Sequence, residues 1–116
     1  MKEHTLKLDE KYYNYILHGT KRIELRLNDE KRKLMHIGDV LLFYKQPLLK
    51  ESFKTKIVDL LYFDSFNEAI SNIHFELIAD KNDNKENLLN DLNRFYSKEK
   101  QENYGIIGIK LELLNQ

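Results

Sequence analysis

The stretch GTKRIELR, residues 19–26, joins the end of an expected helix to a short expected strand. Gly19 follows an apolar stripe at helical spacing, and we expect it to stop that helix in a left-handed conformation, as glycine commonly does just after a helix. From Arg22 to Asn28, polar and apolar residues alternate, which is typical of a strand with one buried face. The stretch therefore predicts a helix-to-strand junction that carries charged side chains on a rigid backbone.

Three charged residues of this junction, Lys21, Glu24 and Arg26, are candidates for a site. Glu24 and Arg26 share parity on the strand, and Lys21 would join them only through a bulge or turn. Spacing alone leaves two interpretations open, a solvated strand face or the lining of a cleft. In a cleft, Arg26 would hold a phosphate or carbonyl oxygen. Lys21 would supply a point charge or a base, and Glu24 would read an amino group or act as a general base.

The rest of the chain alternates between further strands and short helices. We expect a helix after Asp9, a capping box at Ser65 that starts a short helix, and a helical stripe over residues 88–96. The polar residues 80–86 predict a mobile loop. The expected strands span residues 4–8, 22–28, 40–44, 53–63 and 104–114. This pattern predicts an α+β fold, a small mixed or antiparallel β-barrel with two to four flanking helices; a two-layer α+β sandwich is the alternative.

Length and composition indicate one soluble globular domain, residues 1–116. The chain is 41% apolar and 33% charged, and it has no cysteine, which fits a reducing cytoplasm. Neither a signal peptide nor a membrane span is expected. The formal net charge is zero, which argues against binding nucleic acid through bulk charge. However, the N-terminal half is basic and the C-terminal half acidic, so one face of the molecule could be basic.

Aromatic residues are numerous, with seven tyrosines and six phenylalanines. Most fall on apolar stripes and are expected in the core. Tyr96 and Tyr104 flank the charged segment 97–103 and are candidates to stack on a nucleobase. The four histidines are too scattered for a metal-binding motif, and phosphate-loop, dinucleotide and serine-hydrolase motifs are missing from the sequence. We therefore expect no metal and no cofactor.

Three motifs, taken in order, resemble those of the ASCH domain family. GTKRIELR matches the family pattern G-x-K-x-x-E-x-R, and Gly38-Asp39 with the apolar run to Phe43 matches its G-D strand. The segment from Tyr96 through Tyr104 to Ile109 is similar to the closing segment of the family. The resemblance extends over about residues 4–114. It implies a PUA-like fold, a small β-barrel with flanking helices and a cleft on one side.

The resemblance also implies a function, the binding of RNA or of a nucleotide or modified nucleoside in that cleft. Lys21, Glu24 and Arg26 would line the cleft, with Tyr96 and Tyr104 near it. One branch of the wider family contains bacterial amidohydrolases that deacetylate N4-acetylcytidine, and it carries threonine where this chain has Glu24. Lys21 matches that branch, whereas Glu24 departs from it. A small amidohydrolase that acts on an acylated nucleoside with Lys21 and Glu24 as its catalytic pair is one alternative, and an interaction domain without a small ligand is another.

Overall fold

The structure is a computed structural model that describes residues 1–114. The strands are β1 (Glu3–Leu8), β2 (Ile23–Leu27), β3 (Val40–Lys45), β4 (Ser52–Phe63) and β5 (Ile106–Leu113). The α-helices are α1 (Glu10–Leu17), α2 (Phe66–Asn72), α3 (Phe75–Ile78), α4 (Lys85–Phe95) and α5 (Lys98–Tyr104). A short 3₁₀ helix, η1 (Arg32–Leu34), lies between β2 and β3.

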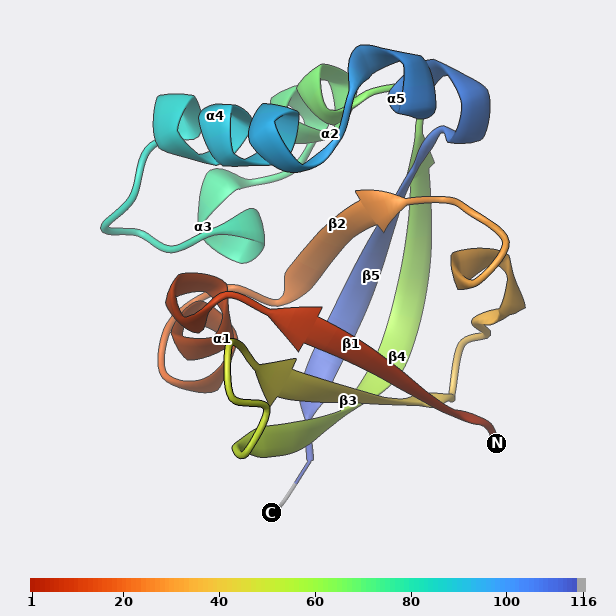
Figure 1. Cartoon of the computed structure of the whole chain (residues 1–116), viewed down its shortest axis with the longest axis vertical. Coiled ribbons are helices and arrows are strands. Elements are labelled where there is room, and N and C mark those ends of the chain that lie inside the picture. Colours follow the sequence, from red (N-terminus) through yellow and green to blue (C-terminus); the bar gives the residue numbers. More distant parts are fainter. Residues whose placement is uncertain (115–116) are drawn as a thin grey trace.

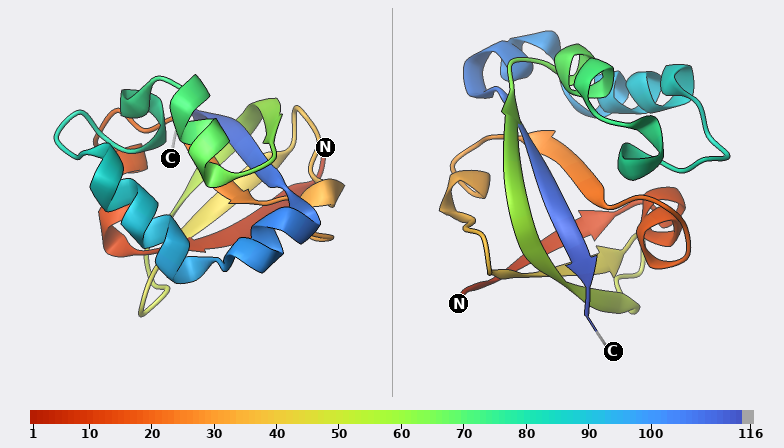
Figure 2. Two further views of the ribbon diagram at one scale, coloured as in Figure 1. Left: turned by 90° about the horizontal axis from the view of Figure 1, so that it is seen from above. Right: turned by 180° about the vertical axis from the view of Figure 1, so that it is seen from behind.

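The five strands form one mixed sheet in the order β1-β3-β4-β5-β2. β1 and β3 are parallel, and the other neighbouring pairs are antiparallel. The sheet curls into a half-barrel, so its two edge strands approach each other (Figures 1 and 2). There the Arg26 Nη2 of β2 donates a hydrogen bond of 2.7 Å to the carbonyl oxygen of Lys7 in β1. We call this contact between the edge strands the seam.

The α+β half-barrel confirms the fold class expected from the sequence. The long β4 strand bends at a register shift between Ile57 and Asp59, which lets it serve both halves of the curled sheet. Five α-helices are seen within residues 1–114, where two to four were expected. The four-residue α3 accounts for the difference, because so short a segment gives no periodic signal. None of the described helices is long and apolar enough to cross a membrane.

The helices lie in two groups around the sheet. Helices α2, α4 and α5 gather above one end of the half-barrel, while α1 lies beside the carboxyl ends of β1 and β3 (Figure 1). The core between them is apolar and includes Ile16 of α1, Phe43 of β3, Phe53 of β4 and Phe66 of α2, each at most 2% exposed. This arrangement places β2 beneath α4 and across from α1.

Gly38-Asp39 has a structural role at the start of β3. Gly38 adopts a φ of 97°, which side-chain-bearing residues rarely adopt. The carboxylate of the buried Asp39 accepts hydrogen bonds from the backbone N–H groups of Lys2 and His36, and it lies 2.8 Å from His4 Nε2. The hydrogen bond with His4 and those from the backbone hold the pKa of Asp39 well below its usual range. The aspartate therefore fixes the N-terminal strand to the sheet.

Candidate functional site

Lys21, Glu24 and Arg26 meet in one buried ionic group. The Lys21 Nζ lies 3.1 Å from Glu24 Oε1, and the Arg26 Nε lies 2.7 Å from Glu24 Oε2. Lys21 is 2% exposed and Glu24 is 6% exposed, so the solvated-face interpretation of the strand is wrong. β2 is covered on both faces, because Ile23, Leu25 and Leu27 enter the core on the other side.

Lys21 joins this group because the backbone before β2 leaves the strand geometry. The regular strand begins only at Ile23, and residues 19–22 are pinned by neighbours distant in sequence. The N–H of Thr20 donates to Asp80 Oδ1 at 3.0 Å, and the N–H of Arg22 donates to the carbonyl of Leu77 at 2.7 Å. These contacts direct the Lys21 side chain to the face of β2 that carries Glu24. In a regular strand, residues 21 and 24 would lie on opposite faces.

Gly19 lets the backbone pass close to Asp80, and the left-handed conformation predicted for this residue is wrong. Within residues 1–114 the glycines with positive φ are Gly38 and Gly105. A Cβ added to Gly19 would come within 2.3 Å of Asp80 Oδ1 and 2.9 Å of the Tyr15 carbonyl. Glycine is therefore required because the Asp80 carboxylate occupies the space of a side chain.

The surroundings of Lys21 favour its ammonium form. Its Nζ donates to the carbonyls of Ile23 and Ile78, both at 2.8 Å, and contacts the Glu24 carboxylate. An ammonium group has three hydrogens for these three acceptors, whereas a neutral amine has two and would face one acceptor without a proton. Burial lowers the pKa of Lys21, and the adjacent Glu24 carboxylate opposes that shift. Lys21 therefore acts as a fixed positive charge.

Glu24 is held in its ionised form. Burial alone would raise the pKa of its carboxyl group, but Lys21 and Arg26 together hold that pKa below its usual value. Burial would likewise lower the pKa of the Arg26 guanidinium, but Glu24 and the Tyr96 side chain raise it. One carboxylate between two cations leaves the group with a net positive charge, in a region where the effective dielectric is low.

A cavity of about 390 Å³ opens above this ionic group. β2 forms one side, α4 forms the facing wall, and the β1–α1 junction forms the rim. Its lining contains equal numbers of basic and acidic side chains, together with aromatic rings. The lining residues are Lys7, Leu8, Asp9, Tyr12, Lys21, Glu24, Leu25, Arg26, Gln46, Ile78, Leu88, Asp91, Leu92, Phe95 and Tyr96.

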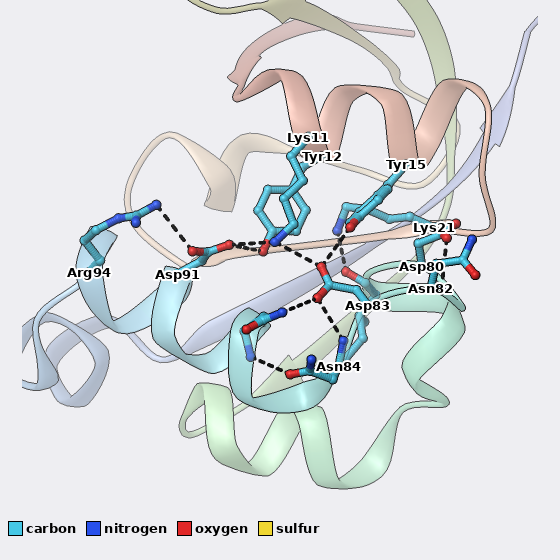
Figure 3. A network of polar contacts seen from close by, with 12 residues as sticks. Lys11, Tyr12, Tyr15, Lys21, Asp80, Asn82, Asp83, Asn84, Asp91 and Arg94 are labelled. Atoms are coloured by element: carbon cyan, nitrogen blue, oxygen red, sulfur yellow. Dashed lines mark hydrogen bonds and ion pairs between the residues drawn. The ribbon is translucent and has the colours of Figure 1, made fainter.

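Polar contacts join α1 to α4 and to the segment just before α4, and they hold the cavity wall in place (Figure 3). Lys11 Nζ lies 3.0 Å from Asp83 Oδ2 and 3.2 Å from Asp91 Oδ2. The hydroxyl of Tyr12 donates to Asp91 at 2.6 Å, and that of Tyr15 donates to Asp83 at 2.9 Å. We call these five residues the clasp. The segment 80–86 was expected to be a mobile loop, but both of its aspartates are anchored. Asp83 belongs to the clasp, and Asp80 accepts the hydrogen bond from Thr20.

The two candidate tyrosines lie in different places. Tyr96 lines the cavity and packs against Phe66, with ring centroids 5.4 Å apart. Tyr104 is 40% exposed on α5 and is not among the residues that line the cavity. Phe95 lines the cavity although it is 48% exposed, which makes it the most accessible ring there. Its helical stripe was visible in the sequence, but its position at a cavity was not.

No sequence pattern pointed to Asp80 and Asp91, because they act through contacts with residues 60 and 79 positions away along the chain. Nor does the described part of the chain, residues 1–114, bring together three or more histidine or acidic side chains that could hold a metal ion. The site is instead a cavity with a buried ionic group, fixed hydrogen-bonding groups of both signs and an exposed aromatic ring.

Comparison with known protein families finds a match to the ASCH domain over residues 6–115. Comparison with curated proteins finds no significant match. Among solved structures, the hypothetical protein PH0355 is 30% identical with a TM-score of 0.83, covering 98% of this chain and 100% of that protein.

Two other solved structures show the same fold. Protein PF0455 from Pyrococcus furiosus is 28% identical with a TM-score of 0.75, and the match covers both chains completely. An ASCH protein from Zymomonas mobilis is 14% identical with a TM-score of 0.57. That match covers 96% of this chain and 67% of the Zymomonas protein.

Proposed function

This chain belongs to the ASCH domain family, and from that premise we propose that its cavity binds a nucleobase, carried by RNA or by a nucleotide or modified nucleoside. Proteins of this family are often proposed to bind RNA. The observation that carries the proposal is the buried Lys21–Glu24–Arg26 group beneath a cavity of about 390 Å³, which is within the usual size range of small-molecule sites.

The chemistry of the lining suits a base better than a polyphosphate. A nucleobase presents donors and acceptors side by side, and this cavity offers both: the donors of Arg26 and Gln46, and the carboxylates of Glu24 and Asp91, with Lys21 contributing its fixed charge. The balanced charge would not favour several phosphates inside the cavity. Aromatic rings at Phe95 and Tyr96 add faces on which a base can stack.

The amidohydrolase alternative finds less support in this geometry. A general base needs a free lone pair and a pKa near the working pH. The Lys21 ammonium has an acceptor for each of its three hydrogens, and the pKa of Glu24 is held low by two cations. Incubation with N4-acetylcytidine tests this alternative, and release of acetate above that of a Glu24→Gln variant would favour it.

A direct test of the binding proposal uses the exposed ring of Phe95. We expect a mixed-sequence, eight-nucleotide single-stranded RNA to bind in calorimetric titration, and Phe95→Ala to weaken binding by about 1–3 kcal/mol, the range for one stacked base. Tyr62→Ala is the matched control, because Tyr62 is 62% exposed on β4 and lines no part of the cavity. Tyr104→Ala tests the remaining tyrosine, since weaker binding would support its predicted contact with the ligand.

Two outcomes would contradict the proposal. One is that neither the RNA nor any of the four free ribonucleosides binds the wild-type protein, which would favour an interaction domain without a small ligand. The other is that Phe95→Ala and Tyr62→Ala bind RNA as tightly as the wild type, which would place the binding surface away from the cavity. Each variant is compared with the wild type by circular dichroism, so that a folding defect is recognised.

A further inference from the structure

A second hollow of about 500 Å³ adjoins the cavity at the seam. Its lining contains four basic side chains, from β1, β2 and the start of η1 with the residue before it, and no acidic one. These are Lys7, Arg26, Lys31 and Arg32. We call this hollow the basic groove. Its charge differs from that of the cavity, where basic and acidic residues are balanced.

The cavity and the basic groove share a wall. Lys7 and Arg26 line both, so the seam between β1 and β2 is the boundary between them. The Arg26 guanidinium binds Glu24 on the cavity side through Nε and the Lys7 carbonyl at the seam through Nη2. A ligand longer than a nucleoside could therefore extend from one hollow into the other over a short path.

The positive charge of the basic groove is only partly compensated by the protein. Lys7 and Lys31 are exposed, and neither has a carboxylate within 4.0 Å among the described residues. Arg32 pairs with Asp29 at 3.2 Å, yet its buried Nε has no hydrogen-bond partner within residues 1–114. Partial desolvation lowers the pKa of Lys31, and repulsion from the nearby charges of Arg32, Arg26 and Lys7 lowers it further, although Asp29 opposes this shift. An anionic ligand would relieve that repulsion.

We propose that the basic groove holds backbone phosphates of a single-stranded RNA whose base occupies the cavity, an inference that rests on the proposed function. Phosphate oxygens accept hydrogen bonds from guanidinium forks and are attracted by lysine charges. Contacts of this kind position a strand, while the groups around a base select it. The basic groove would thus attract the phosphates by charge, and the cavity would recognise the base by hydrogen bonding.

Salt dependence tests the phosphate contacts separately from base binding. Affinity for a 5′-fluorescein-labelled, mixed-sequence octaribonucleotide is measured by anisotropy from 50 to 300 mM KCl. For single strands the log–log slope changes by roughly 0.7 for each phosphate contact. We expect Lys31→Gln to reduce the slope by roughly 0.7 and Lys7→Gln/Lys31→Gln to reduce it by roughly 1.4. At the lowest salt, both should weaken binding several-fold.

Controls separate this inference from the proposed function. Lys56→Gln and Lys56→Gln/Lys110→Gln remove the same charge from exposed positions on β4 and β5 that line neither hollow, and they should keep the wild-type slope. Lys31→Gln should also bind free ribonucleosides as the wild type does. If Lys31→Gln and the double variant match their controls in slope while Phe95→Ala still weakens RNA binding, the basic groove is refuted and the cavity stands. If Phe95→Ala has no effect either, both proposals fail.

Discussion

Glu24 shows how a single residue can determine both the stability and the chemistry of a site. Each of its carboxylate oxygens contacts a different cation, at 3.1 Å and 2.7 Å, in a place where water has little access. Desolvation makes such a group costly to form, but removing one partner costs more, since it leaves buried charge without compensation. The residues that line the cavity floor are therefore also residues on which the fold depends.

We expect Glu24→Gln to reduce the free energy of unfolding by about 3–5 kcal/mol, because Lys21 would keep its buried charge without a carboxylate. Urea unfolding measures the change. The control is Glu30→Gln, which removes a carboxylate that is 88% exposed and 3.6 Å from Lys33; an exposed pair of this kind contributes about 0–1 kcal/mol. A loss below about 1 kcal/mol in Glu24→Gln would show that the three charges are not coupled as the distances indicate.

At the scale of elements, the clasp decides where α4 lies. Leu88 and Leu92 of α4 pack into the core, and Phe95 reaches the cavity one turn further on. Asp83 and Asp91 connect this helix to α1 through Lys11, Tyr12 and Tyr15 (Figure 3). The position of the cavity wall therefore depends on carboxylates that must stay ionised.

Within the clasp, Asp83 makes the stability of the protein depend on pH. Burial alone would raise the pKa of Asp83, but hydrogen bonds from Asn84, Lys11, Asn87 and Tyr15 lower it to about 2 from the usual 3.8. Because the folded-state pKa is the lower one, this stabilisation is present above pH 3.8 and is lost as the pH falls toward 2.

We expect Asp83→Asn to lower the melting temperature at pH 6 and to shrink the difference from the wild type at pH 2.5. The stabilisation at issue is on the order of 1 kcal/mol. Thermal unfolding followed by circular dichroism at both pH values measures it. A constant difference between variant and wild type at the two pH values would contradict the assignment of a low pKa to Asp83.

Elements were easier to predict than the contacts between them. The alternation from Arg22 to Asn28 and the apolar run after Gly38 contain the signal for β2 and β3 within a few residues. The parity of β2 also placed Glu24 and Arg26 together. Strand parity alone could not predict the turn of Lys21 toward Glu24, because the turn depends on Asp80, which lies 60 residues from Thr20 in the sequence. The need for glycine at position 19 could not be predicted either, because it arises from the same Asp80 carboxylate.

At the scale of the whole molecule, the site arises where the half-barrel fails to close. At the seam, the Arg26 side chain joins the edge strands β1 and β2, and the helices α1 and α4 cover the space beside it. Arg26 thus bridges the two edge strands, completes the ionic group and lines both hollows. Ligand binding at this seam would therefore connect the fold, the buried charges and the proposed ligand.

Titration of ¹⁵N-labelled protein with the unlabelled octaribonucleotide tests for binding at the seam. The measured quantity is the change in the chemical shift of each backbone amide. We expect the largest shifts at residues 21–26, which lead into and form most of β2, and at residues 88–96, which form most of α4 and the residue after it, with smaller ones at residues 31 and 32 in the basic groove. Shifts confined to the solvent face of β4 and β5, or no shifts at millimolar RNA, would contradict it.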